Sequence, residues 1–332
     1  MKKACVLGAG AWGTALAIVL ADTGHQVTLW NRRVEVVDHI NRAHTSPRLH
    51  GVELPDSVRA TTDFVQALDS ASVVVSAVSS TGMREVSRAV ARKIPRDSIL
   101  VSATKGLDPK TLQRPLEVWA EESPALTDRL IAMSGPNFAI EVAKRLPAAT
   151  VVAAVAMDAR ERAQSAFMTS YLRAYTNWDI IGVQLGGSFK NIIAIACGMI
   201  EGMGLGYNAQ AATISRGIAE ITRLGVALGA EPLTFAGLSG LGDLVLTATG
   251  HLSRNRQAGI ALGKGESMDS FVARTGYTVE GFTTVKSAVQ LAEANEIDMP
   301  VANVVYKILY GGLPVKRGVS ELMLREKRSE YR

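Results

Sequence analysis

Cysteine is scarce in this sequence of 332 residues, which contains only Cys5 and Cys197. Both lie in apolar segments, so we interpret them as small core residues rather than as parts of a disulfide framework or a metal site. The five histidines include no pair at a spacing typical of metal ligands, and we therefore expect no metal. So few cysteines suit a reducing compartment, and the cytoplasm is the expected location.

The sequence also lacks a strong charge of one sign, since its formal net charge is only +5 at pH 7. It contains no block of Lys and Arg and no basic stretch interleaved with aromatic residues, which argues against a nucleic-acid partner. The modest positive excess fits a solvated surface or a site for anionic ligands. Beyond the N-terminal segment, no apolar run is long and uncharged enough to predict stable membrane insertion.

Glycine, by contrast, is placed at a characteristic spacing. Gly8, Gly10 and Gly13 form the pattern G-x-G-x-x-G between an apolar strand expected at residues 3–7 and a helix expected at residues 12–23. In such a unit the first glycine permits a tight turn, the second lets backbone approach a pyrophosphate, and the third lets the helix pack on its strand. The helix N-terminus adds unpaired N–H groups that can bind an anion. The segment therefore predicts a dinucleotide site.

The same segment has a second interpretation as a secretory signal peptide, because a basic start at residues 1–3 precedes an uncharged run over residues 4–21. A signal peptide needs neither glycines at this spacing nor the second strand that we expect at residues 26–30. We therefore favour the dinucleotide interpretation. Sequencing the mature N-terminus separates the two, because cleavage near residue 21 would remove the glycines.

Predicted strands and helices alternate through the first half of the chain. Strands are expected at residues 3–7, 26–30, 72–77, 99–103, 130–133, 149–154 and 171–176, and helices at residues 12–23, 34–43, 64–68, 83–93 and 112–121. Strands that are apolar almost throughout are typical of a parallel sheet covered by helices on both faces. The sequence therefore predicts an α/β fold that begins, over residues 1–178, with a Rossmann-like doubly wound parallel sheet.

The second half of the chain follows a helical pattern. Helices are expected at residues 180–201, 209–228, 254–262, 268–274, 283–295 and 301–310. We therefore expect an all-helical C-terminal domain over residues 179–332, which would bind the substrate and carry the catalytic group.

The end of the second predicted strand bears on the choice of cofactor. Sites that prefer NAD place an acidic residue there to bind the ribose hydroxyls, whereas this chain has Arg32 and Arg33. Two guanidinium groups can bind a 2′-phosphate, so we expect NADP or NAD with NADP preferred. The alternative is an exposed basic turn without a ligand.

Polar residues also follow two later strands. Lys105 comes just after the strand expected at residues 99–103, and Gly135 and Asn137 follow the strand at 130–133. Ligands of open α/β sheets bind at the carboxyl ends of the strands, which favours a role for these residues in a site. The alternatives are a solvated loop lysine and an ordinary turn.

Two charged residues lie in apolar surroundings. Lys190 directly precedes the apolar run at residues 192–197, and Asp243 lies in a glycine-rich apolar segment. Burial disfavours the ammonium form, as a general base near neutral pH requires, and a buried carboxylate needs a cationic partner, for which Lys190 is the obvious candidate. The alternatives are a lysine that reaches solvent along its stem and an aspartate that caps a helix.

A third polar group precedes the helix expected at residues 254–262. Ser253 can cap that helix, and the open backbone N–H groups together with Arg254 and Asn255 would form a phosphate site. A plain serine cap followed by solvated residues is the alternative.

With these segments assembled, the chain resembles the NAD(P)-dependent glycerol-3-phosphate dehydrogenases of the bacterial type over nearly its whole length. The resemblance rests on segments that occur in the family's order and spacing, namely residues 8–17, 105–106, 135–141, 190–191, 208–220, 237–247, 253–256 and 279–281. It implies interconversion of dihydroxyacetone phosphate and sn-glycerol 3-phosphate, which would supply glycerol 3-phosphate for phospholipid synthesis. A homodimer is plausible.

The resemblance also implies residue roles. It makes Lys190 the general acid/base, which protonates the carbonyl oxygen as hydride arrives, with Asp243 and Lys105 as further catalytic residues. Implied substrate contacts are Lys105, Gly135, Asn137, Lys190, Asn191, Asp243, Thr247, Ser253, Arg254 and Asn255, with Arg254 and Asn255 on the phosphate. Implied cofactor contacts are Gly8, Gly10, Ala11, Trp12, Gly13, Arg32, Arg33, Lys105, Ala139, Arg254, Thr278 and Glu280.

Three departures from the family pattern occur. Ala11 stands where Ser is frequent, Asn137 replaces the usual Ser or Thr, and residues 188–189 replace a pair of small residues. Two other functions remain open, a related β-hydroxyacid or sugar-phosphate dehydrogenase and a non-enzymatic NADP(H)-binding redox sensor. A sensor needs no proton relay, which argues against the second.

Overall fold

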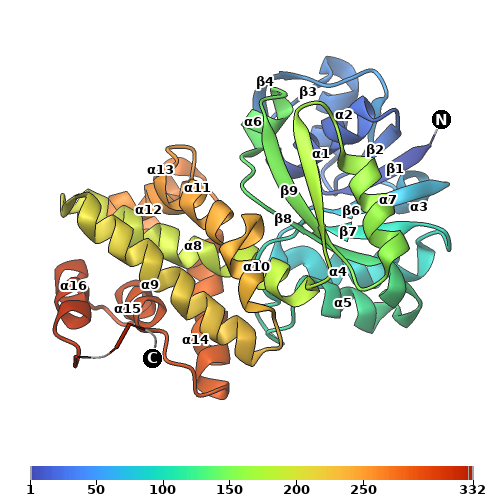
Figure 1. The fold of residues 1–332 in the computed structure, drawn as a ribbon. Coiled ribbons are helices and arrows are strands. Elements are labelled where there is room, and N and C mark those ends of the chain that lie inside the picture. Colours follow the sequence, from blue (N-terminus) through green and yellow to red (C-terminus); the bar gives the residue numbers. More distant parts are fainter. Residues whose placement is uncertain (1, 328, 331–332) are drawn as a thin grey trace. The chain divides into compact units, whose positions relative to one another are not determined.

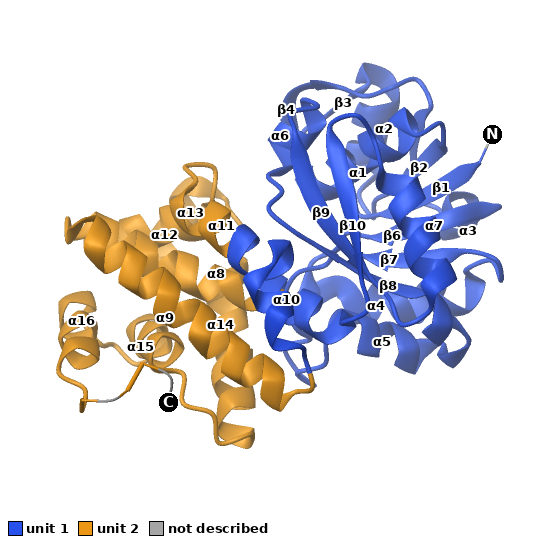
Figure 2. Cartoon of the chain, in the orientation of Figure 1, with its two compact units in different colours: residues 1–187, 230–243 blue, residues 188–229, 244–332 orange. Residues whose placement is uncertain are grey.

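The computed structural model describes residues 2–327 and 329–330, and Figure 1 shows the arrangement of its elements. The chain divides into two compact units, coloured separately in Figure 2. Unit 1 comprises residues 1–187 and 230–243, and unit 2 comprises residues 188–229 and 244–332. Each unit is described by itself.

Unit 1 is built on an eight-stranded sheet in the order β10-β9-β8-β7-β6-β1-β2-β5. Its strands are β1 (Lys3–Leu7), β2 (Gln26–Trp30), β5 (Val58–Thr61), β6 (Ala71–Ser76), β7 (Ile99–Ser102), β8 (Leu130–Ser134), β9 (Ala148–Ala153) and β10 (Leu172–Asn177). Every neighbouring pair is parallel except β8 and β9. The doubly wound, parallel-dominated sheet is thus confirmed.

The antiparallel pairing of β8 with β9 is the one exception among the described strand pairs of this sheet. Between these strands the chain forms only one short helix, α6 (Ala139–Ala143). Five helical residues rise only about 7.5 Å, which is too short to carry the chain back across the sheet to start a parallel strand. β9 therefore starts at the edge where β8 ends.

Helices cover both faces of the sheet, as Figure 1 shows. The helices are α1 (Ala11–Asp22), α2 (Val34–Ala43), α6 and α7 (Met157–Phe167) on one face, and α3 (Phe64–Leu68), α4 (Ser80–Val90) and α5 (Pro115–Glu122) on the other. Successive strand residues alternate between the two cores, so Ala4 and Val6 face the first and Cys5 and Leu7 the second. This alternation explains the continuous apolar runs of the sequence.

Strand order places the expected ligand edge beside β1. The chain passes from β1 outward through β2 to β5 and then returns to β6 on the other side of β1. This reversal is a topological switch point, and ligands of open α/β sheets bind there, at the carboxyl ends of the strands. A two-stranded hairpin of β3 (Thr45–Ser46) and β4 (Leu49–Glu53) precedes β5 and was not expected.

Unit 2 contains helices and no strand among its described residues, which confirms the all-helical second half. Its elements are α9 (Gly206–Ala227), α11 (Asp243–Thr249, of which Asp243 falls in unit 1), α12 (Arg254–Gly263), α13 (Met268–Thr275), α14 (Glu280–Ala294), α15 (Pro300–Tyr310) and α16 (Val315–Met323). The long helix α8 (Ile180–Gly202) starts in unit 1 and ends in unit 2. Residues 230–243 return to unit 1 as α10 (Pro232–Ala236) and the π-helical turn η3 (Leu238–Gly242).

Glycines bring α8 and α12 into backbone contact within unit 2. A Cβ atom on Gly198 would lie 2.2 Å from the carbonyl oxygen of Arg256, and one on Gly259 would lie 2.1 Å from that of Ile195. Gly202 and Gly263 repeat the pattern one turn later. The two helices therefore pack more closely than larger residues would permit, which fixes the start of α12 beside the middle of α8.

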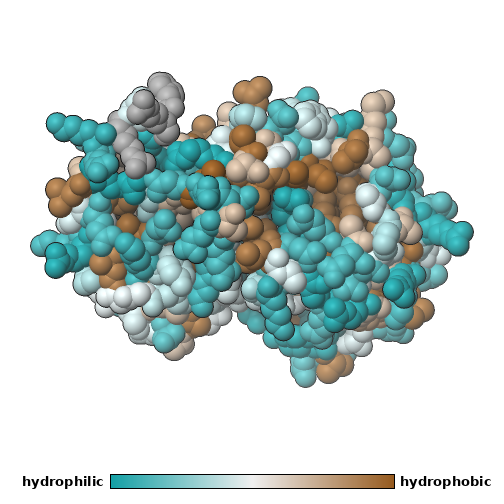
Figure 3. Space-filling model, turned by 90° about the horizontal axis from the view of Figure 1, so that it is seen from below, coloured by the Kyte–Doolittle hydropathy of each residue, from teal (hydrophilic) through white to brown (hydrophobic). Residues whose placement is uncertain are grey.

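Among the described helices, α8 is long and apolar enough to cross a membrane, judged by length and composition alone. However, 89% of its most apolar window is buried inside the protein, as is usual for a helix in a protein core. Hydrophilic side chains cover most of the face drawn in Figure 3, and hydrophobic ones gather there in smaller groups.

Candidate active site

The glycine turn after β1 has the geometry that the sequence predicts. Gly8 has φ +110°, and a Cβ atom there would lie 2.9 Å from the carbonyl oxygen of Ala77. A Cβ atom on Gly13 would lie 1.9 Å from the carbonyl oxygen of Gly8, so the first turn of α1 packs directly on the loop. At Gly10, in contrast, a Cβ atom would meet nothing within 4 Å, so the backbone faces open space there.

The N-terminus of α1 fits a dinucleotide. Gly10 occupies the N-cap position without a side-chain cap, and the first turn carries no acidic residue, so backbone N–H groups and the positive end of the helix dipole are open to an anion. Ala11 and Trp12 begin the helix, and the buried indole Nε1 of Trp12 has no hydrogen-bond partner among the described residues. Residues at this position can therefore hold the pyrophosphate of a nicotinamide cofactor.

Arg32 and Arg33 follow β2 at the same edge of the sheet. Both side chains are exposed, and neither forms an ion pair within the described part of the chain. The backbone N–H of Arg33 donates to the side-chain oxygen of Asn31 at 3.0 Å, which fixes the turn between strand and helix. Two unpaired guanidinium groups at the end of β2 are compatible with a 2′-phosphate.

Lys105 and Asp243 form a buried ion pair in unit 1. The Nζ atom of Lys105 lies 2.9 Å from Oδ2 of Asp243, whose side chain is fully buried, while that of Lys105 is 16% exposed. Ser134, at the end of β8, donates to the same carboxylate oxygen at 3.4 Å. A Cβ atom on Gly187 would lie 2.3 Å from the Ser134 hydroxyl, so this glycine lets α8 approach the group. The predicted pairing of Asp243 with Lys190 stays a prediction.

Asn137 is held by the loop that follows β8. Its Nδ2 atom donates to the carbonyl oxygens of Pro136 at 3.0 Å and Ala149 at 2.8 Å, while its buried Oδ1 atom has no partner among the described residues. One amide hydrogen thus bonds within the loop, and the other ties the loop to the start of β9. Gly135 packs against the same strand, since its Cβ would lie 2.9 Å from Cα of Thr150. Ala139 starts α6, two residues after Asn137.

Lys190 is buried in unit 2, with only 5% of its surface exposed. It lies in α8, and its Nζ atom donates to the hydroxyl of Thr247 on α11 at 2.7 Å, within unit 2. Burial next to a neutral hydroxyl distinguishes this lysine from one that reaches solvent along its stem, which was the alternative.

Asn191, the next residue of α8, joins a ring of hydrogen bonds with the starts of α12 and α14. Its Oδ1 atom accepts from Nδ2 of Asn255 at 2.9 Å, and its Nδ2 atom donates to Oε2 of Glu280 at 3.4 Å. Oδ1 of Asn255 in turn accepts from the backbone N–H of Gly281 at 2.9 Å. These residues are largely buried, so the structure brings together two predicted substrate contacts and one predicted cofactor contact.

The start of α12 has the arrangement expected of a phosphate site. The Ser253 hydroxyl caps the helix by accepting from the backbone N–H of Arg256 at 3.2 Å. Arg254 is exposed and pairs with none of the described residues, whereas Arg256 pairs with Glu201 at 2.6 Å. Thr278 is exposed in the segment before α14.

The predicted site residues therefore form one group in each unit. The group in unit 1 contains the glycine turn, both arginines after β2, Lys105, Gly135, Asn137 and Asp243, and that in unit 2 contains Lys190, Asn191, Thr247, Ser253, Arg254, Asn255, Thr278 and Glu280. The sequence analysis missed Ser134, which contacts Asp243. Its position at the carboxyl end of a strand was the available signal.

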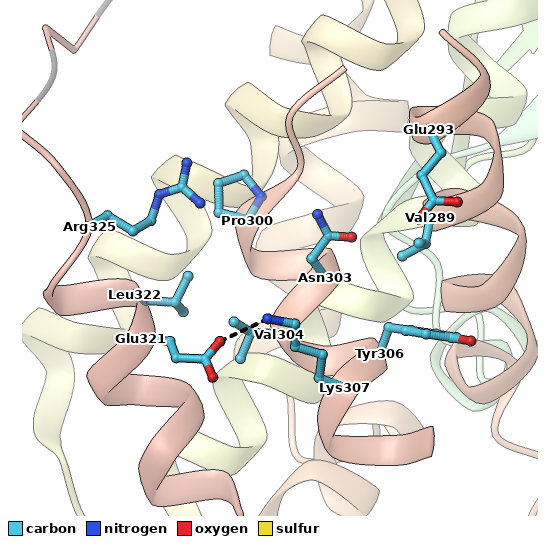
Figure 4. Close-up of a pocket in the computed structure, with 10 residues that line it drawn as sticks. All are labelled: Val289, Glu293, Pro300, Asn303, Val304, Tyr306, Lys307, Glu321, Leu322 and Arg325. Carbon is cyan, nitrogen blue, oxygen red and sulfur yellow. Dashed lines mark hydrogen bonds and ion pairs between the residues drawn. The ribbon is translucent and has the colours of Figure 1, made fainter. Parts of the chain in front are cut away.

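A separate hollow of about 400 Å³ lies in unit 2, between α14, α15 and α16, and contains none of the predicted site residues (Figure 4). Its charged groups are largely neutralised, since Lys307 pairs with Glu321 at 3.1 Å and Arg325 with Asp298 at 2.6 Å. This hollow is therefore separate from both groups of predicted site residues.

Comparison with known proteins agrees with this geometry. Residues 3–160 match the family model of the N-terminal part of NAD-dependent glycerol-3-phosphate dehydrogenase, and residues 179–320 match that of its C-terminal part. The chain is 46% identical to glycerol-3-phosphate dehydrogenase [NAD(P)+] of Streptomyces griseus over 99% of this chain and 98% of the relative. It is 44% identical to that of Bacillus velezensis over 99% and 96%.

A solved structure extends the similarity to the fold. The glycerol-3-phosphate dehydrogenase of Coxiella burnetii superposes with a TM-score of 0.93 at 36% sequence identity, and the match covers 98% of this chain and 99% of that one. The glycine turn, the buried lysine and the order of strands and helices thus occur in a chain that belongs to the family of NAD-dependent glycerol-3-phosphate dehydrogenases.

Proposed function

We propose that this protein interconverts dihydroxyacetone phosphate and sn-glycerol 3-phosphate with NAD(P)H or NAD(P)+ as the redox partner. The observation that carries the proposal is Lys190, whose ammonium group is buried and donates to the Thr247 hydroxyl at 2.7 Å in a chain of this family. A buried amine can exchange a proton with a substrate oxygen.

The residues of unit 1 provide the cofactor site. The backbone around Gly8, Gly10 and Gly13, together with Ala11 and Trp12, would bind the pyrophosphate. Arg32 and Arg33 would bind a 2′-phosphate, so we propose a preference for NADP over NAD. When bound, the nicotinamide donates or accepts the hydride, and the protein's contribution is orientation and charge.

Lys190 would act as the general acid and base. In the direction of reduction its ammonium protonates the C2 oxygen of dihydroxyacetone phosphate, and in the reverse direction its amine takes the proton from the C2 hydroxyl. Lys105 would place a second positive charge at the substrate, and Asp243 holds Lys105 at 2.9 Å. This arrangement stabilises negative charge that develops on the substrate oxygen.

The start of α12 would bind the substrate phosphate. Arg254 is exposed and pairs with none of the described residues, and the backbone N–H groups at the start of α12 provide further donors for an anion. The resemblance adds Gly135, Asn137, Asn191, Thr247, Ser253 and Asn255 as substrate contacts, and Ala139, Arg254, Thr278 and Glu280 on the cofactor side.

In this proposal the two halves of the chain have different functions. Residues 1–178 would form the nucleotide domain, and residues 179–332 the substrate domain. We further propose that the enzyme acts in the cytoplasm, supplies glycerol 3-phosphate for phospholipid synthesis, and forms a homodimer. Light scattering of the purified protein measures the oligomeric state, and a monomer would refute the proposed homodimer.

Substitution of Lys190 tests the proposed reaction. We expect Lys190→Ala to bind NADPH normally but to lose turnover of dihydroxyacetone phosphate by several orders of magnitude, because no other group replaces the proton donor. Absorbance of NADPH at steady state measures turnover, and cofactor fluorescence measures binding. Lys264→Ala, an exposed lysine after α12, is the control and should retain full activity.

Near-normal kcat in Lys190→Ala would remove Lys190 from this role. A wild-type protein that binds NADPH but reduces no dihydroxyacetone phosphate would instead favour a hydroxyacid substrate or a sensor.

A further inference from the structure

We propose that Arg84 and Asp108 are positioning residues, which hold the loop after β7 so that the ammonium group of Lys105 keeps a fixed place at the substrate. The inference rests on the proposed function for the role of Lys105 at the substrate. All of its structural evidence lies within unit 1.

Thr104 attaches this loop to the end of the neighbouring strand β6, on the N-terminal side of Lys105. The Thr104 hydroxyl donates to the carbonyl oxygen of Val78 at 3.0 Å and lies 3.3 Å from the hydroxyl of Ser76, the last residue of β6. Directly after Lys105, Gly106 has φ +97°, a conformation that residues with a side chain rarely adopt. The backbone of Lys105 therefore lies between an anchored residue and a turn.

Asp108 anchors the loop on the C-terminal side of Lys105. Its Oδ1 atom accepts from the backbone N–H groups of Lys110 at 3.0 Å and Thr111 at 2.9 Å. Its Oδ2 atom accepts from Nε of Arg84 at 2.9 Å, and only 5% of the Asp108 side chain is exposed. Burial alone would raise the pKa of this carboxyl, but the three hydrogen bonds outweigh burial and lower the pKa, so Asp108 is charged at neutral pH.

The guanidinium group of Arg84 binds this turn and α5 at the same time. Besides the bond from Nε to Asp108, Nη2 donates to the Thr111 hydroxyl at 3.1 Å and to the side-chain oxygen of Gln113. Its Nη1 atom donates to Oε2 of Glu121 on α5 at 3.1 Å. All three nitrogen atoms of this largely buried side chain are used, which requires the planar fork of an arginine.

Both anchors belong to one stretch of chain, residues 76–84, which forms the end of β6 and the start of α4. Lys105 extends from the loop between these anchors, and its Nζ atom reaches Oδ2 of Asp243 at 2.9 Å. A lysine side chain has many rotamers, so its ammonium group keeps this place only if the backbone that carries it is fixed. A misplacement of about 1 Å at a group that contacts the substrate can cost a large factor in rate.

Chemical labelling of Lys105 tests the positioning without substrate. Asp108→Asn retains an oxygen for the backbone N–H groups of the turn, but its amide nitrogen would face Nε of Arg84, donor against donor, so the link to α4 is lost. An amine held in an ion pair reacts slowly. In the full-length protein, acetylation of Lys105 by acetic anhydride, relative to that of the exposed Lys264, should therefore become about fivefold faster or more in Asp108→Asn. Mass spectrometry of the peptide that contains Lys105 measures this rate.

Arg88→Ala is the matched control. Arg88 lies one turn further along α4, its side chain is 68% exposed, and it pairs with Glu122 of α5 at 3.3 Å. Among the described residues it forms no ion pair with the loop, so this variant should acetylate Lys105 at the wild-type rate. Arg84→Lys is a milder second variant, because it keeps the charge on α4 but cannot bond the turn and α5 together. It should accelerate acetylation as Asp108→Asn does.

Kinetics then show whether the effect reaches the substrate through Lys105. We expect kcat/KM for dihydroxyacetone phosphate to fall about tenfold in Asp108→Asn. Lys105→Ala combined with Asp108→Asn should be no slower than Lys105→Ala alone, because Asp108 acts through an ammonium group that is already absent. A merely structural role of Asp108 would instead add a further loss in the double variant.

Acetylation of Lys105 at the wild-type rate in Asp108→Asn, or in Arg84→Lys if Asp108→Asn does not fold, would overturn the positioning role. A double variant about tenfold slower than Lys105→Ala would overturn it as well. The labelling needs no substrate, so a wild-type protein inactive toward dihydroxyacetone phosphate would refute the proposed function while leaving the labelling result interpretable.

Discussion

Glu220 is a buried acid that the proposed chemistry does not use. It lies on α9, is 2% exposed, and accepts hydrogen bonds from the backbone N–H groups of Val301 at 2.8 Å and Ala302 at 3.3 Å. Pro300 starts α15 and has no N–H, so Glu220 caps the first free donors of that helix. Burial raises the pKa of this carboxyl to about 7, and the two backbone hydrogen bonds oppose the rise.

This carboxyl should make stability depend on pH. Its pKa in the folded protein lies above the ordinary value of 4.5, so between pH 4.5 and 7 the folded state holds a proton that the unfolded chain has lost. The free energy of unfolding should therefore fall as pH rises through this window, by on the order of 3 kcal/mol. Glu220→Gln should remove this slope and be the more stable protein above pH 7.

Urea unfolding at pH 5, 6, 7 and 8 measures the slope. Glu293→Gln, an exposed acid on α14, is the control and should keep the wild-type dependence. Parallel wild-type and Glu220→Gln curves would show that Glu220 is ionised throughout.

The second prediction concerns the two arginines after β2. If Arg32 and Arg33 bind a 2′-phosphate, replacing both by Ala removes charge-assisted hydrogen bonds worth about 1.5–3 kcal/mol each. We expect the KM for NADPH to rise at least tenfold and the KM for NADH to change less than twofold. Equal effects on the two cofactors would make the pair a general surface charge. Arg42→Ala, an exposed arginine at the end of α2, is the control.

Single residues show where sequence analysis reaches its limit. Strand ends and glycine spacing were sufficient to predict the positions of Lys105, Gly135 and the glycine turn at the ends of their strands, because local order along the chain determines these positions. The ring of Asn191, Asn255 and Glu280 joins residues 64 and 89 positions apart. No local sequence pattern encodes that pairing. The hydrogen bonding of the Asn137 side chain likewise depends on a residue of β9, which is distant from it in the sequence.

Among the elements, the contact of α8 with α12 offers a sharp test. Gly259→Ala places a methyl group 2.1 Å from the carbonyl oxygen of Ile195, so the helices must separate. We expect a loss of stability of about 2 kcal/mol or more, together with lower activity, since α12 carries Arg254. Thermal unfolding and steady-state turnover measure the two effects.

A second helical glycine provides the control. A Cβ atom on Gly82 in α4 would meet only the Ser79 hydroxyl, at 3.5 Å, so Gly82→Ala should be neutral or stabilise by up to about 1 kcal/mol. Similar losses of stability in both variants would mean that the close contact of α8 with α12 at Gly259 is not the cause.

Elements with a strong apolar pattern were predicted, and those without one were missed. The buried strands β1, β2, β6 and β7 and the apolar helix α8 all occur where expected. Helix α7 and helix α16 were missed because polar residues dominate them, and β5 because it has only four residues with Arg59 among them. The direction of β9 depends on the length of α6, which local periodicity does not report.

At the scale of the whole molecule, family membership and site chemistry agree. The two family models meet along the chain between residues 160 and 179, and the strand-to-helix change of the sequence falls in the same stretch. The overall class was predictable because it depends on hydrophobic periodicity. The exact course of the chain was not, since residues 230–243 fall within the unit that the sequence assigns to the first half.

That return of residues 230–243 has a consequence for protein engineering. A chimera made with one crossover, at the end of the nucleotide-binding half, would take Lys105 from one parent and its buried counter-ion Asp243 from the other. A chimera that keeps unit 1 intact therefore needs three junctions, one inside α8 and one on either side of residues 230–243.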